Sequence, residues 1–354
     1  MQLDERFMKK AIELAEKGGR NTYRNPRVGA VIVKNNRIIA TGYHAKFGEK
    51  HAERMAIDHC AHPEELHDST LYVTLEPCTH YGKQPPCVQA IIDSGIKRVV
   101  IGQLDPNPIV AHKGAAILKA HQIDVKMNCL TSEAESLNKH YNYFYRHKKP
   151  YIVLKQALSL DGKIAAKPGE RTAITGKRAN RFVHEERLGY QAILVGSGTV
   201  LADNPILLPS ENSDYPPIRI IVDRSGKTLH FEAFKLFEHP EPIWIFTRSA
   251  LQEKAPDHVK IIQTDDFSIP KIVDDIGQQG VQSIYVEGGA QIHHTFLQAH
   301  CYEEVITYLA PKLIGGTGLS AFSGNGMIDH ENNLTFKSIE RIGEDLRIVS
   351  ERVK

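Results

Sequence analysis

The stretch that decides the fold of this chain lies between residues 51 and 87 and holds His51-Ala52-Glu53, Glu76-Pro77-Cys78 and Pro85-Pro86-Cys87. One imidazole and two thiolates are three good zinc ligands, which leaves the fourth tetrahedral position for water. Zinc lowers the pKa of such a water to about 7, so hydroxide becomes available at neutral pH. Glu53 is not needed as a ligand, and its carboxylate can carry a proton to a leaving amine. The stretch therefore predicts a catalytic zinc on His51, Cys78 and Cys87, with Glu53 as the catalytic acid and base.

Two interpretations without catalysis compete with this prediction: a closed structural zinc site, and a pair of buried cysteines without metal. A structural site is usually built from four protein ligands that include closely spaced cysteine pairs. No C-x-x-C occurs in this chain, which favours the catalytic interpretation. The order His-x-Glu and then Pro-Cys is typical of zinc deaminases, in which the second cysteine normally follows as P-C-x-x-C.

The wider cysteine spacing resembles one particular deaminase family. Eight residues separate Cys78 from Cys87, and this segment is similar to the deaminase half of the bifunctional riboflavin-biosynthesis deaminase/reductases, where a long loop separates the ligand cysteines. Residues 25–31 (Asn-Pro-Arg-Val-Gly-Ala-Val) and 105–108 (Asp-Pro-Asn-Pro) resemble the same family. The residues that the resemblance implies for the deaminase substrate pocket are Asn25, His44, His80 and Lys83, with Lys83 meeting the substrate phosphate.

Length, charge and cysteine usage set the broad class. The 354 residues are enough for two domains. With 44 basic and 42 acidic residues, the net charge of +2 predicts no attraction to nucleic acid or to anionic membranes. Five scattered cysteines are typical of a reducing compartment. The N-terminal residues lack the apolar core of a signal peptide, and no apolar run approaches the ~20 residues of a membrane helix, so we expect a cytoplasmic protein.

Alternating β-rich and helical patterns predict an α/β fold for the first domain, residues 1–147. Two β-rich runs joined by Asn35-Asn36 are typical of a hairpin. Helices are expected to open near His51 and at Pro85-Pro86, and a strand is expected over residues 71–75. The zinc ligands would then lie at helix N-termini and at the carboxyl end of a strand, where α/β sheets place their sites.

The second domain, residues 148–354, follows a helix and a charged run. The helix is expected to carry Leu137, Tyr141 and Phe144 on one side, and the run over 146–150 ends in proline and marks the boundary. The β-rich runs of the second domain are 151–157, 191–195, 218–222, 243–246, 283–286, 305–308 and 346–349. Most of these runs alternate with helical patterns, whereas the last two do not. This predicts a mixed sheet whose final strands pair antiparallel.

Two glycine turns carry the functional signal of the second domain. Gly196-Ser197-Gly198-Thr199 and Glu287-Gly288-Gly289-Ala290 each follow a β-rich run and open a helical pattern. Such a turn exposes backbone N–H groups at the positive end of a helix, which makes a phosphate cradle. Neither is G-x-G-x-x-G, and each alone is more typical of an ordinary strand-to-helix turn.

Together with residues 159–163, 199–205 and 310–316, these turns resemble the riboflavin reductase domain. The resemblance implies a cytidine-deaminase-like three-layer α/β/α domain followed by a dihydrofolate-reductase-like mixed-sheet α/β domain that uses NADPH. The cofactor-binding residues that it implies are Ala157, Thr199, Asp203, Gly289, Ala290, Gln291, Ile292, His293, His294 and Thr295. The reductase substrate residues that it implies are Arg187, Leu207 and Glu287. Arg224 follows the run 218–222, and its guanidinium is suited to the 2′-phosphate of NADPH.

The chain departs from this family at three positions of the reductase site. In a family segment Gly-x-Ser-x-Trp-Ile-Thr, Arg171 replaces serine and Ala173 replaces tryptophan. Ser210 stands where family members usually carry arginine. If positions 171 and 210 both flank the substrate phosphate, the positive charge has moved across the pocket. We therefore expect Arg171 and Ser210 in the reductase substrate site and Ala173 in the wall of the cofactor site.

The function implied by the resemblance is two consecutive steps of riboflavin biosynthesis. The first is zinc-dependent hydrolytic deamination of 2,5-diamino-6-(5-phosphoribosylamino)pyrimidin-4(3H)-one. The second is NADPH-dependent reduction of the ribose of 5-amino-6-(5-phosphoribosylamino)uracil to the ribityl form, in a homo-oligomer formed through the reductase domain. The alternatives are a deaminase whose C-terminal domain only senses a ligand, and a nucleic-acid-editing deaminase, which predicts a basic face and P-C-x-x-C.

Overall fold

The computed structural model describes residues 2–79, 85–108, 110–251, 254–324 and 332–353. The chain divides into two compact units, Met1–Lys148 and Lys149–Lys354, and this division falls within the charged run expected at the domain boundary. Each unit has its own apolar core and is described by itself. Within the ranges above, no helix has both the length and the apolar character needed to cross a membrane.

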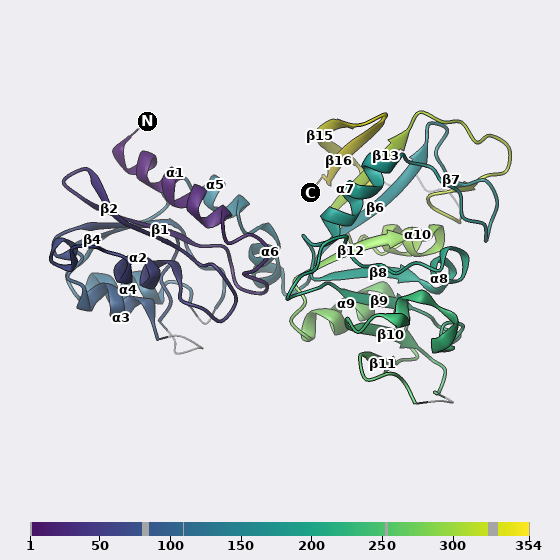
Figure 1. The fold of residues 1–354 in the computed structure, drawn as a ribbon, viewed down its shortest axis with the longest axis horizontal. Helices are drawn as coiled ribbons and strands as arrows, with labels where there is room; N and C mark the ends of the chain where they lie inside the picture. The colour runs from purple at the N-terminus through teal and green to yellow at the C-terminus, as the bar shows by residue number, and fades with distance from the viewer. Residues whose placement is uncertain (1, 80–84, 109, 252–253, 325–331, 354) are drawn as a thin grey trace. The chain divides into compact units, whose positions relative to one another are not determined.

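The first unit is built on a five-stranded sheet with the order β2-β1-β3-β4-β5 (Figure 1). Its strands are β1 (Gly29–Lys34), β2 (Arg37–Tyr43), β3 (Thr70–Leu75), β4 (Arg98–Gln103) and β5 (Asp124–Lys126). β1 pairs antiparallel with β2 and β3, whereas β3, β4 and β5 run parallel. The predicted hairpin is confirmed: Asn35 and Asn36 have φ values of 49° and 59°, the positive values that a type I′ turn requires.

Helices cover both faces of this sheet (Figure 1). They are α1 (Leu3–Glu16), α2 (Ala52–Asp58), the 3-10 helix η1 (Pro63–Leu66), α3 (Cys87–Asp93), α4 (Lys113–Ala120), α5 (Thr131–Ser136) and α6 (Lys139–His147). On one face α1 packs Phe7 against Val31. On the other face α2, α3 and α4 bury Ala56, Ile91 and Leu118. The predicted three-layer α/β/α architecture is therefore confirmed.

One predicted helix is wrong in its extent. The helical side expected from Leu137 to Phe144 is interrupted between α5 and α6. Asn138 leaves the helical conformation, with φ −126° and ψ 38°. Its side chain instead accepts a hydrogen bond from the Arg27 N–H (2.7 Å) and donates one to the Arg27 carbonyl (2.9 Å). Asn138 thus interrupts the helix and forms long-range hydrogen bonds to Arg27 instead. These bonds hold the start of α6 against the loop before β1.

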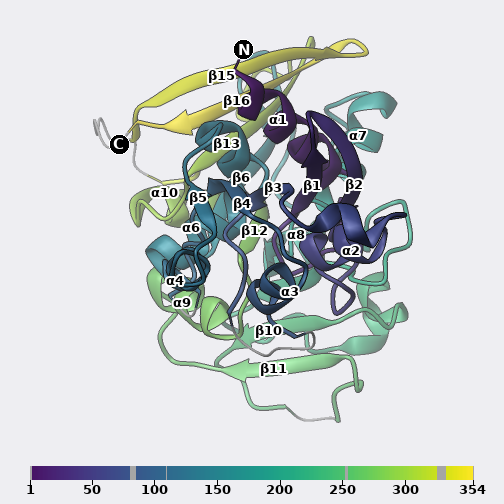
Figure 2. The ribbon, with the colours of Figure 1, turned by 90° about the vertical axis from the view of Figure 1, so that its left-hand side faces the viewer.

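The second unit contains a nine-stranded sheet with the order β11-β10-β9-β8-β12-β6-β13-β16-β15, and Figure 2 shows it from edge to edge. Its strands are β6 (Tyr151–Ser159), β8 (Ala192–Gly196), β9 (Ile218–Val222), β10 (Ile243–Thr247), β11 (Val259–Gln263), β12 (Ser283–Gly288), β13 (Glu304–Ala310), β15 (Leu334–Ile342) and β16 (Asp345–Arg352). The strands from β11 to β13 run parallel, and β16 and β15 pair antiparallel. The predicted mixed sheet with an antiparallel finish is confirmed.

Helices also cover both faces of the second sheet. They are α7 (Lys177–Arg187), α8 (Ser197–Asp203), α9 (Ile269–Gln278), α10 (Ala290–Gln298) and the 3-10 helices η2 (Phe231–Ala233) and η3 (Lys235–Glu238). A small separate ladder pairs β7 (Lys163–Ala165) with β14 (Leu319–Ser320). On one face Ile276 of α9 and Phe296 of α10 pack together with Ile220, and on the other face Val200 of α8 packs with Val195. As predicted, the two glycine turns open α8 and α10.

Candidate active sites

Three side chains converge at the carboxyl end of β3. His51 immediately precedes α2, Cys78 follows β3, and Cys87 is the first residue of α3. The His51 Nδ1 atom lies 3.4 Å from the Cys78 sulfur and 3.3 Å from the Cys87 sulfur. The three ligand atoms lie within 4.8 Å of one another, and no other such group of His, Cys, Asp or Glu occurs among the described residues. The structure thus brings together the side chains that were predicted as zinc ligands.

These distances fit a tetrahedral zinc ion. With Zn–S near ~2.3 Å and Zn–N near ~2.05 Å, a sulfur and a nitrogen ligand lie roughly 3.5 Å apart. Hydrogen bonding with Cys87, followed by the contact with His51, lowers the pKa of the Cys78 thiol, which favours the thiolate that zinc binds. Since the described residues add no fourth protein ligand, the donor set fits a catalytic rather than a closed site.

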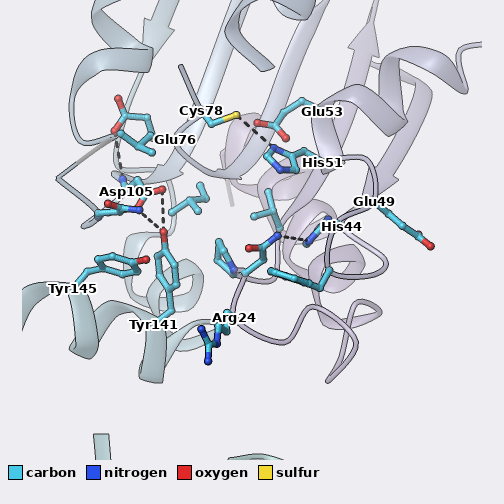
Figure 3. A pocket seen from close by; sticks show the side chains of 18 residues that line it. Arg24, His44, Glu49, His51, Glu53, Glu76, Cys78, Asp105, Tyr141 and Tyr145 are labelled. Carbon is cyan, nitrogen blue, oxygen red and sulfur yellow. Dashed lines mark hydrogen bonds between the residues drawn. The ribbon is translucent and has the colours of Figure 1, made fainter. Parts of the chain in front are cut away.

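Glu53 lies beside these ligands in the first turn of α2, with 3% of its surface exposed. Burial raises the pKa of its carboxyl group to about 7, and the neighbouring Cys78 adds to the rise. Figure 3 shows the carboxylate next to His51 and Cys78. A carboxyl group in this environment can both take up and release a proton near neutral pH.

A cavity of about 300 Å³ opens over these side chains (Figure 3). This volume is at the lower end of the ~300–1,000 Å³ range of small-molecule sites. The lining residues are Arg24, Asn25, Pro26, Val28, His44, Phe47, Gly48, Glu49, His51, Glu53, Leu75, Glu76, Cys78, Asp105, Asn107, Val110, Tyr141 and Tyr145. The predicted substrate residues Asn25 and His44 therefore share one cavity with the zinc ligands, whereas His80 and Lys83 lie outside the described residues.

The hydrogen bonds of His44 decide which atom Asn25 offers to the cavity. Burial lowers the pKa of His44, so its imidazole is neutral. The Nδ1 atom lies 3.1 Å from the Lys50 carbonyl oxygen and must donate to it. The Nε2 atom therefore accepts, and its partner 3.1 Å away is the Asn25 amide nitrogen. This arrangement leaves the Asn25 side-chain oxygen as an acceptor for a substrate N–H.

Seven polar residues of the cavity wall were not predicted as site residues: Arg24, Glu49, Glu76, Asp105, Asn107, Tyr141 and Tyr145. Burial raises the pKa of Asp105 to about 6, and the Tyr141 hydroxyl donates to its carboxylate at 3.0 Å. Tyr141 and Tyr145 belong to α6. A one-sided aromatic pattern on a helix predicts core packing, so the sequence held no signal that separates a cavity tyrosine from a core tyrosine.

In the second unit a buried ion pair joins two predicted substrate residues. Arg187 ends α7 and Glu287 lies in β12. The Arg187 guanidinium donates from Nε to one Glu287 oxygen (2.5 Å) and from Nη2 to the other (3.0 Å). Burial alone would raise the pKa of Glu287, but Arg187 and Lys155 lower it to about 2. The carboxylate therefore stays charged and fixes both cations.

Lys155 in β6 was not predicted as a site residue. Its ammonium lies 3.8 Å from the Glu287 carboxylate, and burial lowers its pKa. Burial also raises the pKa of Asp203, and Arg171 and Lys155 oppose that rise, so these charges lie within electrostatic reach of one another. The predicted cofactor residue Ala157 follows Lys155 on the same face of β6. A lysine directly after four apolar residues of a β-rich run was the signal that could have identified it.

The two glycine turns meet at the carboxyl ends of the neighbouring strands β8 and β12. A Cβ atom on Gly196 would lie 2.7 Å from the Ile292 side chain, and one on Gly289 would lie 3.1 Å from the Thr199 hydroxyl. Glycine at these positions therefore lets the turns approach closely. The starts of α8 and α10 therefore lie side by side, although each turn alone was only a weak signal.

Several predicted cofactor and substrate side chains are engaged within the fold. His293 is buried, its Nε2 lies 3.3 Å from the Val286 carbonyl oxygen, and burial lowers its pKa to about 4. The Thr295 hydroxyl donates to the Gln291 carbonyl at 2.7 Å, and Leu207 packs in the apolar core. Ala290 is buried, and Ile292 and His294 are half-buried. These positions face a ligand with their backbone more readily than with their side chains.

Arg171, Ala173 and Ser210, at which a departure from the family is expected, are exposed, as is Arg224. Of these residues, Arg171 is close enough to Asp203 for its charge to lower the pKa of that carboxyl group. The Arg224 guanidinium lies 5.9 Å from the centre of the Phe267 ring, beyond the end of β9. Ala173 and Ser210 have no polar side-chain contact to a site residue among the hydrogen bonds that the described residues make.

The first unit has a sheet of the cytidine-deaminase type and a set of zinc ligands. The second unit has a mixed sheet, two glycine turns and a buried Lys–Glu–Arg group. Together these features define a deaminase fused to a reductase. The zinc-binding region of cytidine and deoxycytidylate deaminases matches residues 1–103, and the RibD C-terminal domain matches residues 150–348. Both halves of the predicted fold are thus those of known families.

Relatives and solved structures match over nearly the whole chain. The riboflavin biosynthesis protein RibD of Bacillus amyloliquefaciens is 42% identical, over 98% of this chain and 96% of its own. RibD of Escherichia coli is 37% identical, over 97% of this chain and 98% of its own. The structure of Acinetobacter baumannii RibD (TM-score 0.91, 32% identity) and that of the Thermotoga maritima diaminohydroxyphosphoribosylaminopyrimidine deaminase/5-amino-6-(5-phosphoribosylamino)uracil reductase (TM-score 0.88, 37% identity) each cover 99% of both chains.

This chain therefore belongs to the RibD family of bifunctional riboflavin-biosynthesis enzymes. It is a zinc-dependent deaminase and an NADPH-dependent reductase that acts on small pyrimidine substrates. The prediction of a two-step enzyme is confirmed in preference to a nucleic-acid-editing deaminase or a deaminase with a sensing domain.

Proposed function

We propose that the first unit deaminates 2,5-diamino-6-(5-phosphoribosylamino)pyrimidin-4(3H)-one at the site built from His51, Glu53, Cys78 and Cys87. The observation that carries this assignment is the convergence of three zinc-ligand atoms beside a buried carboxylate, at one side of a cavity that can hold a pyrimidine. His51, Cys78 and Cys87 would hold the zinc, which when bound activates a water molecule as the nucleophile.

Glu53 moves the protons of the reaction. Its carboxylate accepts a proton from the water as the oxygen bonds to the ring carbon C2. It then donates a proton to the amino group as the carbon–nitrogen bond breaks, so one water is consumed and one ammonia is released. The Asn25 side-chain oxygen, oriented by His44, accepts a ring N–H and holds C2 in position.

The Glu53→Gln variant tests this assignment because glutamine keeps the shape of the side chain but cannot carry the proton. We expect the zinc content to stay at one per chain and the deaminase kcat to fall by about 10²-fold or more. Reduction of the uracil substrate by the same preparation is the control for folding. Deamination at the original rate would remove Glu53 from the mechanism.

The second unit reduces the ribose at the group formed by Lys155, Arg187, Asp203 and Glu287. The cradle at the starts of α8 and α10 is suited to the pyrophosphate of NADPH, which when bound supplies a hydride to the ribose C1′. As the hydride reaches C1′ the sugar ring opens, and its ring oxygen needs a proton. Lys155 is a buried cation with a lowered pKa next to this group, so it is suited to donate that proton.

A homo-oligomer formed through the reductase domain and a cytoplasmic location stay predictions. Exposed apolar side chains gather on and beside the β15–β16 hairpin, and they are Leu334, Phe336, Ile339, Leu346 and Val353. β15 is an edge strand of the sheet, and an exposed apolar edge strand favours association with another chain. This supports a second copy as the partner, and light scattering of the intact chain measures it.

A further inference from the structure

The buried charges of the reductase site continue into a second polar cluster on the same face of the sheet. In the strand register, Arg347 of β16 lies beside Tyr308 of β13, and Tyr308 lies beside Ala157 of β6. Because side chains alternate along a strand, Lys155 is on the same face of β6 as Ala157. Three neighbouring strands therefore carry an arginine, a tyrosine and a lysine on one face.

Glu186 of α7 joins the arginine to the tyrosine. Its carboxylate accepts a hydrogen bond from the Tyr308 hydroxyl at 2.6 Å and one from the Arg347 Nε at 3.0 Å. The side chains of Arg347 and Glu186 are only 13% and 12% exposed, so water screens this ion pair little. Burial raises the pKa of the Tyr308 phenol, and Glu186 adds to the rise, so the hydroxyl stays protonated and donates.

The ring of Tyr308 connects this cluster to the reductase lysine. The Lys155 ammonium lies 5.9 Å from the centre of the ring, within the range of a cation–π interaction. Tyr308 is fully buried, and its hydroxyl donates to a carboxylate, which makes the ring more electron-rich. Two groups thus attract the ammonium: the Tyr308 ring, and the Glu287 carboxylate at 3.8 Å.

We propose that Tyr308 is a positioning residue of the reductase: its ring holds the Lys155 ammonium at the site, while Glu186 and Arg347 fix the ring. The inference rests on the proposed role of Lys155 as the proton donor. A donor needs a fixed position and its proton. Lysine has a flexible four-carbon stem, and burial disfavours its charged form. The ring opposes both effects without touching the substrate.

The surroundings of Lys155 make its proton measurable through the pH dependence of reduction. Burial and Arg187 lower the pKa of Lys155, whereas Glu186, Glu287 and Asp203 raise it. Two histidines also lie within electrostatic reach of Lys155, and burial lowers the pKa of each, so neither titrates in the alkaline range; they are His184 and His293. A loss of reduction at alkaline pH therefore reports the proton of Lys155.

The test measures NADPH-dependent reduction of the uracil substrate as a function of pH. For Tyr308→Leu, which removes the ring, we expect kcat to fall about 3- to 30-fold and the KM for NADPH to change less than about twofold. Its alkaline loss of activity should begin roughly 0.5 to 1 pH unit lower, because the ring no longer favours the charged lysine. Tyr308→Phe keeps the ring and should lose less than about threefold.

Two further variants separate positioning from packing. Tyr302→Leu is the matched control, because this buried tyrosine lies against another cation, Arg352 at 5.6 Å, and packs with Leu154 on the opposite face of β6 from Lys155. It should lower thermal stability and leave the reductase kcat and pH profile unchanged. Glu186→Gln keeps the shape of the side chain and removes its charge, so it should shift the alkaline limb in the same direction as Tyr308→Leu.

Lys155→Met distinguishes failure of this inference from failure of the function on which it rests. Reduction should fall about 10²-fold or more in Lys155→Met, and adding Tyr308→Leu should lower it no further. Reduction at the original rate in Lys155→Met would refute the proton-donor role itself. If Lys155→Met is inactive but Tyr308→Leu and Glu186→Gln keep the original pH profile, the positioning role is overturned. Should Tyr308→Leu fail to fold, the profile of Glu186→Gln alone decides.

Discussion

Arg171 is a residue at which we expect this chain to differ from its family, and its surroundings give that expectation a physical meaning. Its charge opposes the rise that burial causes in the pKa of Asp203, so the guanidinium lies near the buried charges of the reductase site. Ser210, where an arginine is expected, is exposed and uncharged. Arg171 therefore places a positive charge near Asp203, whereas Ser210 contributes none.

We predict that Arg171 contacts the substrate phosphate in the reductase site. In Arg171→Ala the reductase KM should rise about 10-fold or more, because a hydrogen bond to a charged group contributes ~1.5–3 kcal/mol. Adding Ser210→Arg to that variant should restore the original KM, whereas Lys167→Ala, an exposed neighbour, should leave it unchanged. Steady-state kinetics with the uracil substrate measure all three, and an unaltered KM in Arg171→Ala would place this side chain in solvent.

The sequence could predict individual residues only where chemistry restricts the residue type. Few side chains bind zinc, so His51, Cys78 and Cys87 were visible as a group. Arg24 and Tyr145 were not, because an arginine in a loop or a tyrosine on a helix has many ordinary roles. Their place in the site depends on a cavity, and the cavity exists only after α6 has packed beside the loop before β1.

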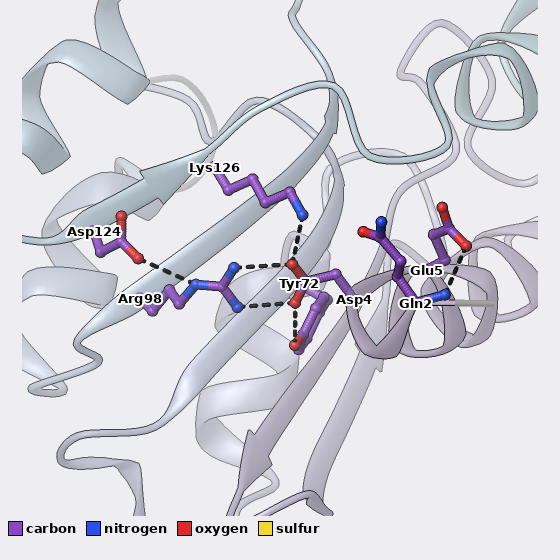
Figure 4. Close-up of polar contacts among 7 residues, drawn as sticks. All are labelled: Gln2, Asp4, Glu5, Tyr72, Arg98, Asp124 and Lys126. Atoms are coloured by element: carbon purple, nitrogen blue, oxygen red, sulfur yellow. Dashed lines mark hydrogen bonds and ion pairs between the residues drawn. The ribbon is translucent and has the colours of Figure 1, made fainter.

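Helix α1 is held to three strands of its sheet by one carboxylate (Figure 4). Asp4 accepts two hydrogen bonds from Arg98 of β4 (2.8 and 2.9 Å), one from Lys126 of β5 (2.8 Å) and one from Tyr72 of β3 (2.9 Å). The hydrogen bonds from Arg98, together with those from Lys126 and Tyr72, hold the pKa of Asp4 well below its usual range. The charged form is therefore bound more tightly in the folded state than in the unfolded state.

This network makes the stability of the first unit dependent on pH. Because folding lowers the pKa of Asp4, its contribution is fully present above about pH 5 and is lost as the pH falls through about 4 toward the folded value. Asp4→Asn should therefore destabilise the first unit by about 1–3 kcal/mol at pH 7, and the difference from the original protein should shrink below about pH 4.

Calorimetry at pH 7, 5 and 3 measures this effect on the transition that also responds to zinc removal. Asp124→Asn is the matched control, because its carboxylate contacts the same Arg98 at 3.1 Å but is 71% exposed, and it should change stability by less than about 1 kcal/mol. A loss in Asp4→Asn that is the same at every pH would show that the charge of Asp4 is not the cause.

Elements could be predicted from the sequence where burial requires apolar residues, and not where the element is exposed. The strand Ile218–Val222 was predicted with its observed limits because it is apolar and nearly all buried. β15 was not predicted, since almost every residue of it is exposed and no alternation is present. The break at Asn138 was also invisible, because it depends on hydrogen bonds to Arg27, 111 residues earlier.

At the scale of the whole molecule, the two activities occupy units with separate cores. The apolar clusters of the first unit draw on residues before 131, and those of the second begin at Ile152. All three zinc ligands belong to the first unit, and the buried Lys155–Glu287–Arg187 group belongs to the second. Loss of metal should therefore affect only one of the two reactions.

We expect removal of zinc by a chelator to lower deamination by about 10²-fold or more while NADPH-dependent reduction of the uracil substrate changes less than about twofold. Ammonia release and NADPH absorbance, followed in the same sample, measure the two activities. Adding back zinc should restore deamination. A parallel loss of reduction would mean that the second unit depends on the metal site of the first.

The long reach of Asp4 also sets an order of events during synthesis on the ribosome. Its partners Arg98 and Lys126 lie 94 and 122 residues later in the chain. At ~5–20 residues per second, roughly 6 to 24 seconds pass between the appearance of Asp4 and that of Lys126. β1 and β3 are synthesised within this interval, so Phe7 and Met8 of α1 are at first covered only in part. The N-terminal helix therefore completes its apolar packing only after β4, which contributes Val100, has been synthesised.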